Sequence, residues 1–205
     1  MKRAFASLAA LLVLSCAGAE NAAVPTTVHP QKIGIIGTGE IGSNVKVGTP
    51  REAAAFGDVV LISVPYAATP QVGRDYAAEL KGKVVLDTGN PYPGRDGDMA
   101  VRDRKRGTGV ASAEYLPGTR LVRAFNAINS GPLANQAFHK PEKLGIPLAA
   151  DDPEAMKIAE QLVSDAGFDP VPVGGLARAR EFDVGTPVYV RGMTAAELRK
   201  ALGLR

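Results

Sequence analysis

The sequence predicts an α/β fold in which helices cover both faces of a doubly wound, mainly parallel β-sheet. Three observations support this prediction. Short apolar runs rich in Val, Ile and Leu recur along the chain, as strands buried on both faces require. Segments with helical start signals separate these runs. A glycine-rich turn directly follows the first run, where a strand would pass into a helix.

Six apolar runs are predicted to be strands. The first ends in glycine and the second is closed by proline, as expected for short strands followed by turns. Prolines in the last two runs favour positions at the edge of the sheet, because proline cannot donate a ladder hydrogen bond. The runs are residues 32–37, 58–65, 83–87, 120–125, 146–150 and 170–173.

Helices are predicted between these runs, at residues 49–56, 71–80, 152–166 and 194–202. The first has Thr49 as its cap, proline at its first position and an acid in its first turn. The third opens with Asp152 and Pro153 and stops at a glycine. Alternation of strands and helices implies parallel strands joined by helical crossovers.

Composition sets limits on the class of protein. The 205 residues suffice for one domain with attachments. Hydrophobic residues make up 45% and charged residues 22%, which excludes an intrinsically disordered chain and a polytopic membrane protein. Lys and Arg number 24 against 21 Asp and Glu, without a basic cluster interleaved with aromatics, so we expect no nucleic-acid partner.

Residues 1–19 have the pattern of a signal peptide. Lys2 and Arg3 precede an apolar run, residues 4–14, that is shorter than the about 20 residues of a membrane-spanning helix. We therefore expect export to the bacterial periplasm. Residues 20–32, which contain two prolines, are expected to be a linker.

The mode of signal cleavage stays open between two interpretations. Residues 17–19 form a small-residue cleavage site, whereas Cys16 ends a run that resembles a lipobox. In the second case a lipid on Cys16 would anchor the chain to the membrane. Cys16 is the only cysteine, so the chain can form no internal disulfide.

The glycine-rich turn spans residues 37–42 and has the spacing of a dinucleotide-binding turn. Its first glycine permits a tight turn, its second lets a pyrophosphate approach the backbone, and its third lets the helix pack on the strand. Free N–H groups at the helix N-terminus would bind the phosphates. The alternative interpretation is a plain tight turn between strand and helix.

From this turn onward, the chain resembles the coenzyme F-420 (F420)-dependent NADP oxidoreductase family. The N-terminal domain of pyrroline-5-carboxylate reductase and the cytosolic domain of membrane ferric reductases are related to that family. The resemblance implies a Rossmann-like fold, NADP(H) as cofactor, and coenzyme F-420 or a flavin as co-substrate. It rests on residues 33–42, 60–66, 82–91, 121–126, 151–155 and 165–171.

The resemblance also implies which residues contact the cofactor. The glycine-rich turn would bind the pyrophosphate, the segment after the second strand would line the cofactor, and the chain after the third and fourth strands would border the nicotinamide. All of them follow carboxyl ends of predicted strands, where open α/β sheets bind ligands. The implied residues are Gly37, Thr38, Gly39, Glu40, Ile41, Gly42, Ser63, Val64, Pro65, Tyr66, Asn90, Ala124 and Asn126.

The chain departs from the family after Gly42. Only residues 43–48 precede the next helix, whereas family members have a long helix, a strand and a phosphate-binding loop there. We therefore expect a shortened first helix and second strand, an unpaired sheet edge and no reader of the ribose or its 2′-phosphate. Asp58 is not that reader, because it begins a strand. A real deletion, a gene-sequence artefact and rescue by another segment all stay open.

No acid–base set and no metal site are expected. His29 and His139 are far apart, and there is a single cysteine. The pair of acids ending in Asp152 is better explained by helix capping, and residues 102–106 are expected to form a solvated helix face. Hydride transfer needs no acid–base set, because the cofactors supply the chemistry.

The favoured interpretation is an NADP(H)-dependent oxidoreductase that moves hydride between the nicotinamide and a deazaflavin or flavin acceptor. The alternative is a degenerate, non-catalytic Rossmann binding module of the bacterial envelope. Residues 33–150 would form the NAD(P)-binding domain, and residues 151–205 a helix–strand extension on the same sheet. Partners would be small molecules, and homodimer formation stays open.

Overall fold

A computed structural model describes residues 32–37 and 47–204 of the chain. Its strands form one six-stranded sheet in the order β1-β2-β3-β4-β5-β6. The first four strands are parallel, β5 runs antiparallel to β4, and β6 is parallel to β5, which confirms the predicted α/β fold with a mainly parallel sheet. The strands are β1 (Ile33–Ile36), β2 (Val59–Ile62), β3 (Val84–Asp87), β4 (Arg120–Arg123), β5 (Gly145–Ala150) and β6 (Asp169–Gly174).

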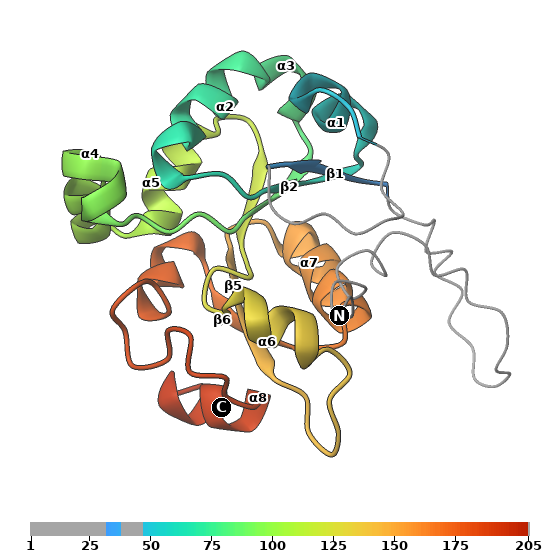
Figure 1. Cartoon of the computed structure of the whole chain (residues 1–205), viewed down its shortest axis with the longest axis vertical. Coiled ribbons are helices and arrows are strands. Elements are labelled where there is room, and N and C mark those ends of the chain that lie inside the picture. Colours follow the sequence, from blue (N-terminus) through green and yellow to red (C-terminus); the bar gives the residue numbers. More distant parts are fainter. Residues whose placement is uncertain (1–31, 38–46, 205) are drawn as a thin grey trace, which may run out of the picture.

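Helices lie on both faces of this sheet, with α1, α2 and α3 on one side and α6 and α7 on the other (Figure 1). The α-helices are α1 (Pro50–Phe56), α2 (Thr69–Asp75), α3 (Ala77–Leu80), α4 (Pro93–Arg106), α5 (Thr108–Tyr115), α6 (Ser130–Asn135), α7 (Pro153–Asp165) and α8 (Ala195–Ala201). Two 3₁₀ helices complete the set, η2 (Tyr66–Ala68) and η3 (Leu176–Glu181).

Each strand of the parallel part divides its side chains between two apolar clusters. In β2, Val60 and Ile62 pack with α1, α2 and α3, while Val59 packs into the cluster that contains α7. In β3 the same alternation separates Val85 from Leu86. Successive residues of a strand point to opposite faces, so the near-continuous apolar runs of the sequence serve two cores at once.

Strand β1 pairs only with β2 within the described sheet. This position agrees with the missing second strand expected after Gly42. Helix α1 covers β1 closely, because a Cβ atom on Gly34 would lie 1.9 Å from the carbonyl oxygen of Ala53. The helix begins as predicted, with Thr49 and Glu52 forming a reciprocal capping box.

The predicted edge position of the fifth run is wrong, because β5 lies between β4 and β6. Pro147 is tolerated there since β4 pairs only with Ala149 and Ala150, which leaves the proline on the part of β5 that β4 does not reach. The sixth run, at the end of the sheet, does occupy an edge.

The helix predicted at residues 71–80 consists of two helices, α2 and α3, separated at Tyr76. At this break, the guanidinium of Arg51 donates a 2.7 Å hydrogen bond to the carbonyl oxygen of Asp75 and stacks on the Tyr76 ring. None of the described helices is long and apolar enough to span a bilayer.

Candidate functional site

The carboxyl ends of β1 to β4 meet at one edge of the sheet, because these four strands are parallel. Gly37 follows β1, Ser63 follows β2, and Ala124 follows β4. Asn90 lies three residues beyond β3, and Asn126 lies three residues beyond β4. The structure thus brings together at one edge these five of the residues that the family resemblance implied around a cofactor.

The ends of β1 and β2 approach each other closely. The backbone N–H of Ser63 donates a 2.9 Å hydrogen bond to the carbonyl oxygen of Ile36. A Cβ atom on the next residue, Gly37, would lie 2.4 Å from the carbonyl oxygen of Ser63, so a side chain there would displace one of the two chains. Ser63 and Pro65 are exposed and Val64 is half-buried. These side chains therefore border the open edge.

Five predicted site residues lie outside the described residues, as do the segments predicted to be a signal peptide and, up to residue 31, a linker; these five are Thr38, Gly39, Glu40, Ile41 and Gly42. Their predicted roles stay predictions. The described part of the glycine-rich turn is Gly37, at the point where the turn leaves β1.

Two asparagines pair across the ends of β3 and β4. The side-chain N–H of Asn90 donates a 2.8 Å hydrogen bond to the backbone carbonyl of Asn126. Asn126 is only 1% exposed, and neither polar atom of its side chain has a hydrogen-bond partner in the described structure. The side-chain oxygen of Asn90 is likewise buried and unpartnered there. Buried polar atoms of this kind cost stability unless a water or a ligand completes their hydrogen bonding.

The backbone just before Asn126 is strained. Phe125 has φ 58°, a left-handed conformation that is uncommon for an aromatic residue. It separates the fully buried Ala124 from Asn126 and so aims the chain after β4 in a direction that a regular extension of the strand would not take. Such outliers concentrate at binding sites.

The ring of Tyr66 packs in the core and is not exposed at the edge. Its hydroxyl donates to Asp103 across 3.4 Å, and its ring meets Tyr115 edge-on at 6.4 Å. Burial raises the pKa of Tyr66 well above its ordinary value. Only the backbone of Tyr66, next to Pro65, is therefore available at the carboxyl ends of the strands.

The basic run at residues 102–106 is helical, as expected, but it is not wholly solvated. Asp103 is completely buried and accepts hydrogen bonds from Tyr115 at 2.7 Å and from Arg102 at 3.0 Å. This acid therefore ties α4 to α5.

A buried ion cluster beneath the edge was not predicted from the sequence. Arg123, at the end of β4, is fully buried and donates to Asp87 at 2.7 Å and to Asp183 at 3.5 Å. Desolvation alone would lower the pKa of Arg123, but the neighbouring carboxylates of Asp87 and Asp183 raise it above its ordinary value. Asp87 also accepts from the backbone N–H of Gly89 at 2.7 Å, which orients the loop that leads to Asn90.

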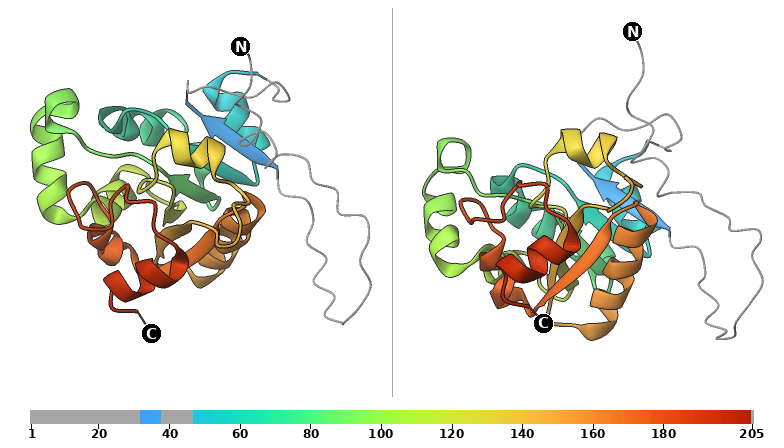
Figure 2. Two further views of the ribbon diagram at one scale, coloured as in Figure 1. Left: turned by 60° about the horizontal axis from the view of Figure 1, so that its bottom comes forward. Right: turned by 90° about the horizontal axis from the view of Figure 1, so that it is seen from below.

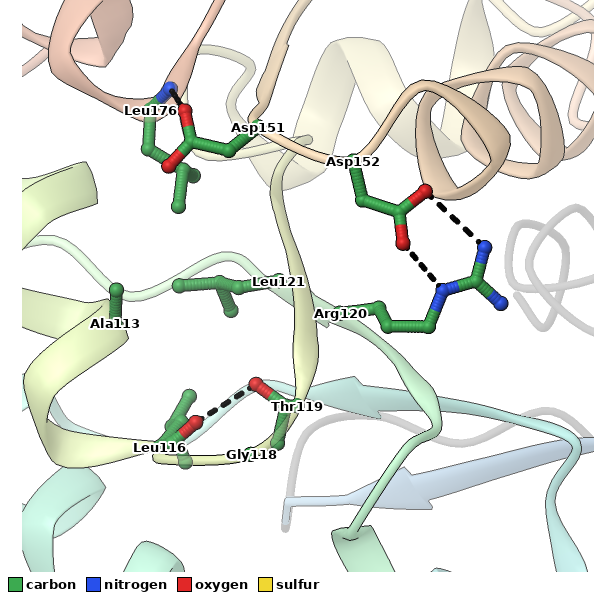
Figure 3. A pocket seen from close by; sticks show the side chains of 9 residues that line it. All are labelled: Ala113, Leu116, Gly118, Thr119, Arg120, Leu121, Asp151, Asp152 and Leu176. Carbon is green, nitrogen blue, oxygen red and sulfur yellow. Dashed lines mark hydrogen bonds and ion pairs between the residues drawn. The ribbon is translucent and has the colours of Figure 1, made fainter.

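A cavity of about 220 Å³ lies at the opposite edge of the sheet, near the start of β4 (Figure 3). Asp152 caps α7 by accepting from two backbone N–H groups, which confirms its predicted role, and it pairs with Arg120 at 2.6 Å. Asp151 accepts from the backbone N–H of Leu176 at 2.8 Å. Both acids are thus committed to structural contacts, far from the ends of β1 to β3.

No cluster of three or more His, Cys, Asp or Glu side chains suited to a metal occurs in residues 32–37 and 47–204. The chemistry that the edge itself offers is hydrogen bonding from amides and backbone.

Comparison with known proteins gives a consistent result. The family model for coenzyme F420-dependent NADP oxidoreductase matches residues 40–91. The F420-dependent NADP reductase of Methanothermobacter marburgensis is 30% identical over 167 residues, covering 78% of this chain and 73% of that protein. The F420-dependent NADP reductase of Methanocaldococcus jannaschii is 28% identical over 159 residues, covering 76% and 70%.

The fold also recurs among solved structures. A protein from Sinorhizobium meliloti superposes with a TM-score of 0.61 at 24% sequence identity, over 70% of each chain. At this identity the similarity establishes the shared α/β fold.

Proposed function

The chain belongs to the coenzyme F420-dependent NADP oxidoreductase family, and from this premise we propose that it transfers hydride between NADP(H) and a deazaflavin or flavin acceptor. By family the chain is an NADP-dependent oxidoreductase. The identity of the acceptor belongs to the proposal, which the names of the relatives and the geometry of the edge support.

The observation that carries the proposal is the unpartnered amide of Asn126. A nicotinamide ring bears a carboxamide, which has one hydrogen-bond donor group and one acceptor. Asn126 offers the complementary acceptor and donor, and both are buried without partners within the described structure. The side-chain oxygen of Asn90 adds a second acceptor beside them. These residues fit a nicotinamide at the ends of β3 and β4.

When bound, the two cofactors would supply the hydride-transfer chemistry, and Asn90 and Asn126 would hold the nicotinamide. The chain's own residues position the rings. Ala124 and Asn126, both buried, keep water from the end of β4. The ion pair of Asp87 and Arg123 holds the two flanking loops at a fixed separation.

Because the segment after Gly42 is short, the chain has few residues that can contact the adenosine half of NADP(H). We propose that the nicotinamide end and the pyrophosphate turn provide most of the affinity, with little discrimination between NADPH and NADH. The comparisons give no support to the alternative of a non-catalytic binding module.

Calorimetric titration of the purified chain with NADPH and then NADH tests the proposal, with circular dichroism in the same buffer as a check on folding. We expect micromolar binding of NADPH. Oxidation of NADPH would then be followed with F420 and with FMN as acceptors. A folded chain that binds neither nucleotide would contradict the proposal.

A further inference from the structure

A C-terminal segment, residues 183–191, crosses to the carboxyl edge of the sheet and is here called the strap. In both views of Figure 2 the C-terminal part, drawn in red, runs beside the chain that follows β4. Asp183 fixes one end of the strap, by accepting from the backbone N–H of Thr108 at 3.2 Å and from Arg123. At the other end, the N–H of Val190 donates a 3.0 Å hydrogen bond to the carbonyl of Ala127.

The strap places Tyr189 opposite Tyr92, and their hydroxyls share a hydrogen bond. Tyr92 lies two residues beyond Asn90, and Val190, next to Tyr189, contacts the residue that follows Asn126. The two phenols therefore join the chain after β3 to the strap, and the strap is itself hydrogen-bonded to the chain after β4. Val190 has φ 51°, so the strap holds Tyr189 in place at the cost of backbone strain.

The phenol pair can donate a hydrogen bond to a ligand. Whichever hydroxyl donates to the other, the accepting hydroxyl keeps a proton of its own. Burial, followed by the hydrogen bond with Tyr92, raises the pKa of Tyr189 well above its ordinary value, so the phenol stays protonated at neutral pH. Tyr92 is 39% exposed, and the guanidinium of Arg95 stacks on its ring at 5.2 Å. This stacking holds a half-exposed ring in a fixed orientation.

We propose that Tyr92 and Tyr189 form the acceptor side of the site and bind the carbonyl edge of a flavin or deazaflavin ring. The inference rests on the proposed function, because it takes the asparagine pair as the nicotinamide side. Flavins and deazaflavins share a pyrimidinedione edge with two carbonyl oxygens, which accept hydrogen bonds from phenols. Negative charge gathers at this edge when the ring is reduced, and a positioned O–H donor stabilises it.

The test is a fluorescence titration with F420 and, separately, with FMN, without nucleotide. Tyr92→Phe and Tyr189→Phe each remove one hydroxyl and keep the ring. We expect the dissociation constant of the acceptor to rise about tenfold in each variant, the loss expected of one hydrogen bond. The dissociation constant of NADPH, measured by calorimetry, should stay within about twofold. Tyr76→Phe, between α2 and α3, is the matched control and should change neither constant.

The outcomes separate the two proposals. Loss of affinity for both probes in both variants supports binding of the shared ring edge, and loss for one probe alone identifies that ring as the acceptor. Unchanged acceptor affinity in both variants, or no binding of either probe by the native chain, overturns the inference. If NADPH still binds and is oxidised with F420 or FMN as acceptor in that case, the proposed function stands without the tyrosine pair. A folded native chain that binds F420 or FMN but not NADPH contradicts the proposed function instead.

Discussion

Arg123 and Asn126 lie three positions apart around the end of β4 and represent two opposite ways of burying a polar side chain. The terminal nitrogens of Arg123 have carboxylate partners and its Nε has none, whereas neither polar atom of the Asn126 amide has a partner in the part of the chain that the structure describes. Removing one member of a buried ion pair leaves an unpaired charge and is costly, while removing an unpartnered buried amide removes no hydrogen bond. The two residues should therefore respond differently to substitution.

Replacement of Asn126 by Leu should separate stability from function. We expect the free energy of unfolding to stay equal or rise, because two unpartnered buried atoms are replaced by apolar groups of similar size. The dissociation constant of NADPH should rise about tenfold or more, since the carboxamide loses its hydrogen bonds. Urea unfolding and calorimetry measure the two effects. The control is Asn129→Ala, at an exposed asparagine before α6; equal NADPH affinity in native chain and N126L would refute the assignment.

Replacement of Arg123 by Met should lower the free energy of unfolding. It leaves the carboxylates of Asp87 and Asp183 buried beside an apolar side chain, and breaking such a pair costs about 3–5 kcal/mol. Urea unfolding followed by circular dichroism gives the loss. Arg106→Met removes an arginine from the exposed ion pair with Glu114 and should change stability little. A loss no larger in R123M than in R106M would show that the buried cluster does not stabilise the fold.

Among the elements, the starts of α1, α7 and α8 followed from the sequence because capping is a local interaction, whereas the starts of α4, α5 and α6, which have no side-chain cap, were not predicted. Thr49 and Thr194 each form a capping box with the glutamate three residues later. The break at Tyr76 could not be predicted in this way. It lies beside Arg51, a residue from another helix, whose guanidinium donates to the carbonyl oxygen of Asp75. Local sequence patterns do not contain such contacts.

The start of α7 predicts a pH dependence of stability. Hydrogen bonds from Arg120 and from the backbone N–H of Ala155 hold the pKa of Asp152 well below its ordinary value of 3.8. A carboxylate with a lowered pKa stabilises the fold above its ordinary pKa, and this contribution disappears as the pH falls through the lowered value. Asp152→Asn should therefore reduce the melting temperature at pH 7, and the difference from the native chain should shrink below about pH 4.

Thermal melts across this pH range provide the measurement. Glu154→Gln is the matched control, because Glu154 pairs with Lys157 on the exposed face of the same helix. It should change the melting temperature little at any pH. A difference between native chain and D152N that stays constant from pH 7 to pH 2.5 would contradict the role assigned to Arg120 and the cap.

On the scale of the whole molecule, the glycine-rich turn follows a strand at one end of the sheet, β1, and not a central strand. Strands β2, β3 and β4 continue the sheet on one side of β1, and the described structure contains no strand on the other. The matched region spans 70–73% of the length of the two F420-dependent NADP reductases compared above. The described residues thus include the ends of β3 and β4, where we propose that the nicotinamide binds. The six residues between Gly42 and Thr49 are too few for a helix and the strand that would read the ribose.

We propose that the chain is exported, on the basis of residues 1–19. When the chain is expressed in a bacterium, we expect it in the periplasmic fraction, with the mass of a chain whose first residue is Glu20. Membrane attachment that is lost in Cys16→Ser would instead identify a lipid anchor on this cysteine. An unprocessed chain in the cytoplasmic fraction would contradict export. Mass spectrometry of the fractions distinguishes these results.

The sequence by itself determined the fold class, the six strands, the helix caps and the edge of the sheet at which a ligand would lie. These follow from periodicity, from capping and from the direction of parallel strands, all of which act over short distances along the chain. Only the tertiary structure decided which polar groups meet at that edge. Tyr92 and Tyr189 are 97 residues apart, and Arg123 and Asp183 are 60 apart. Their interactions depend on burial and on contacts that form only when distant segments fold together.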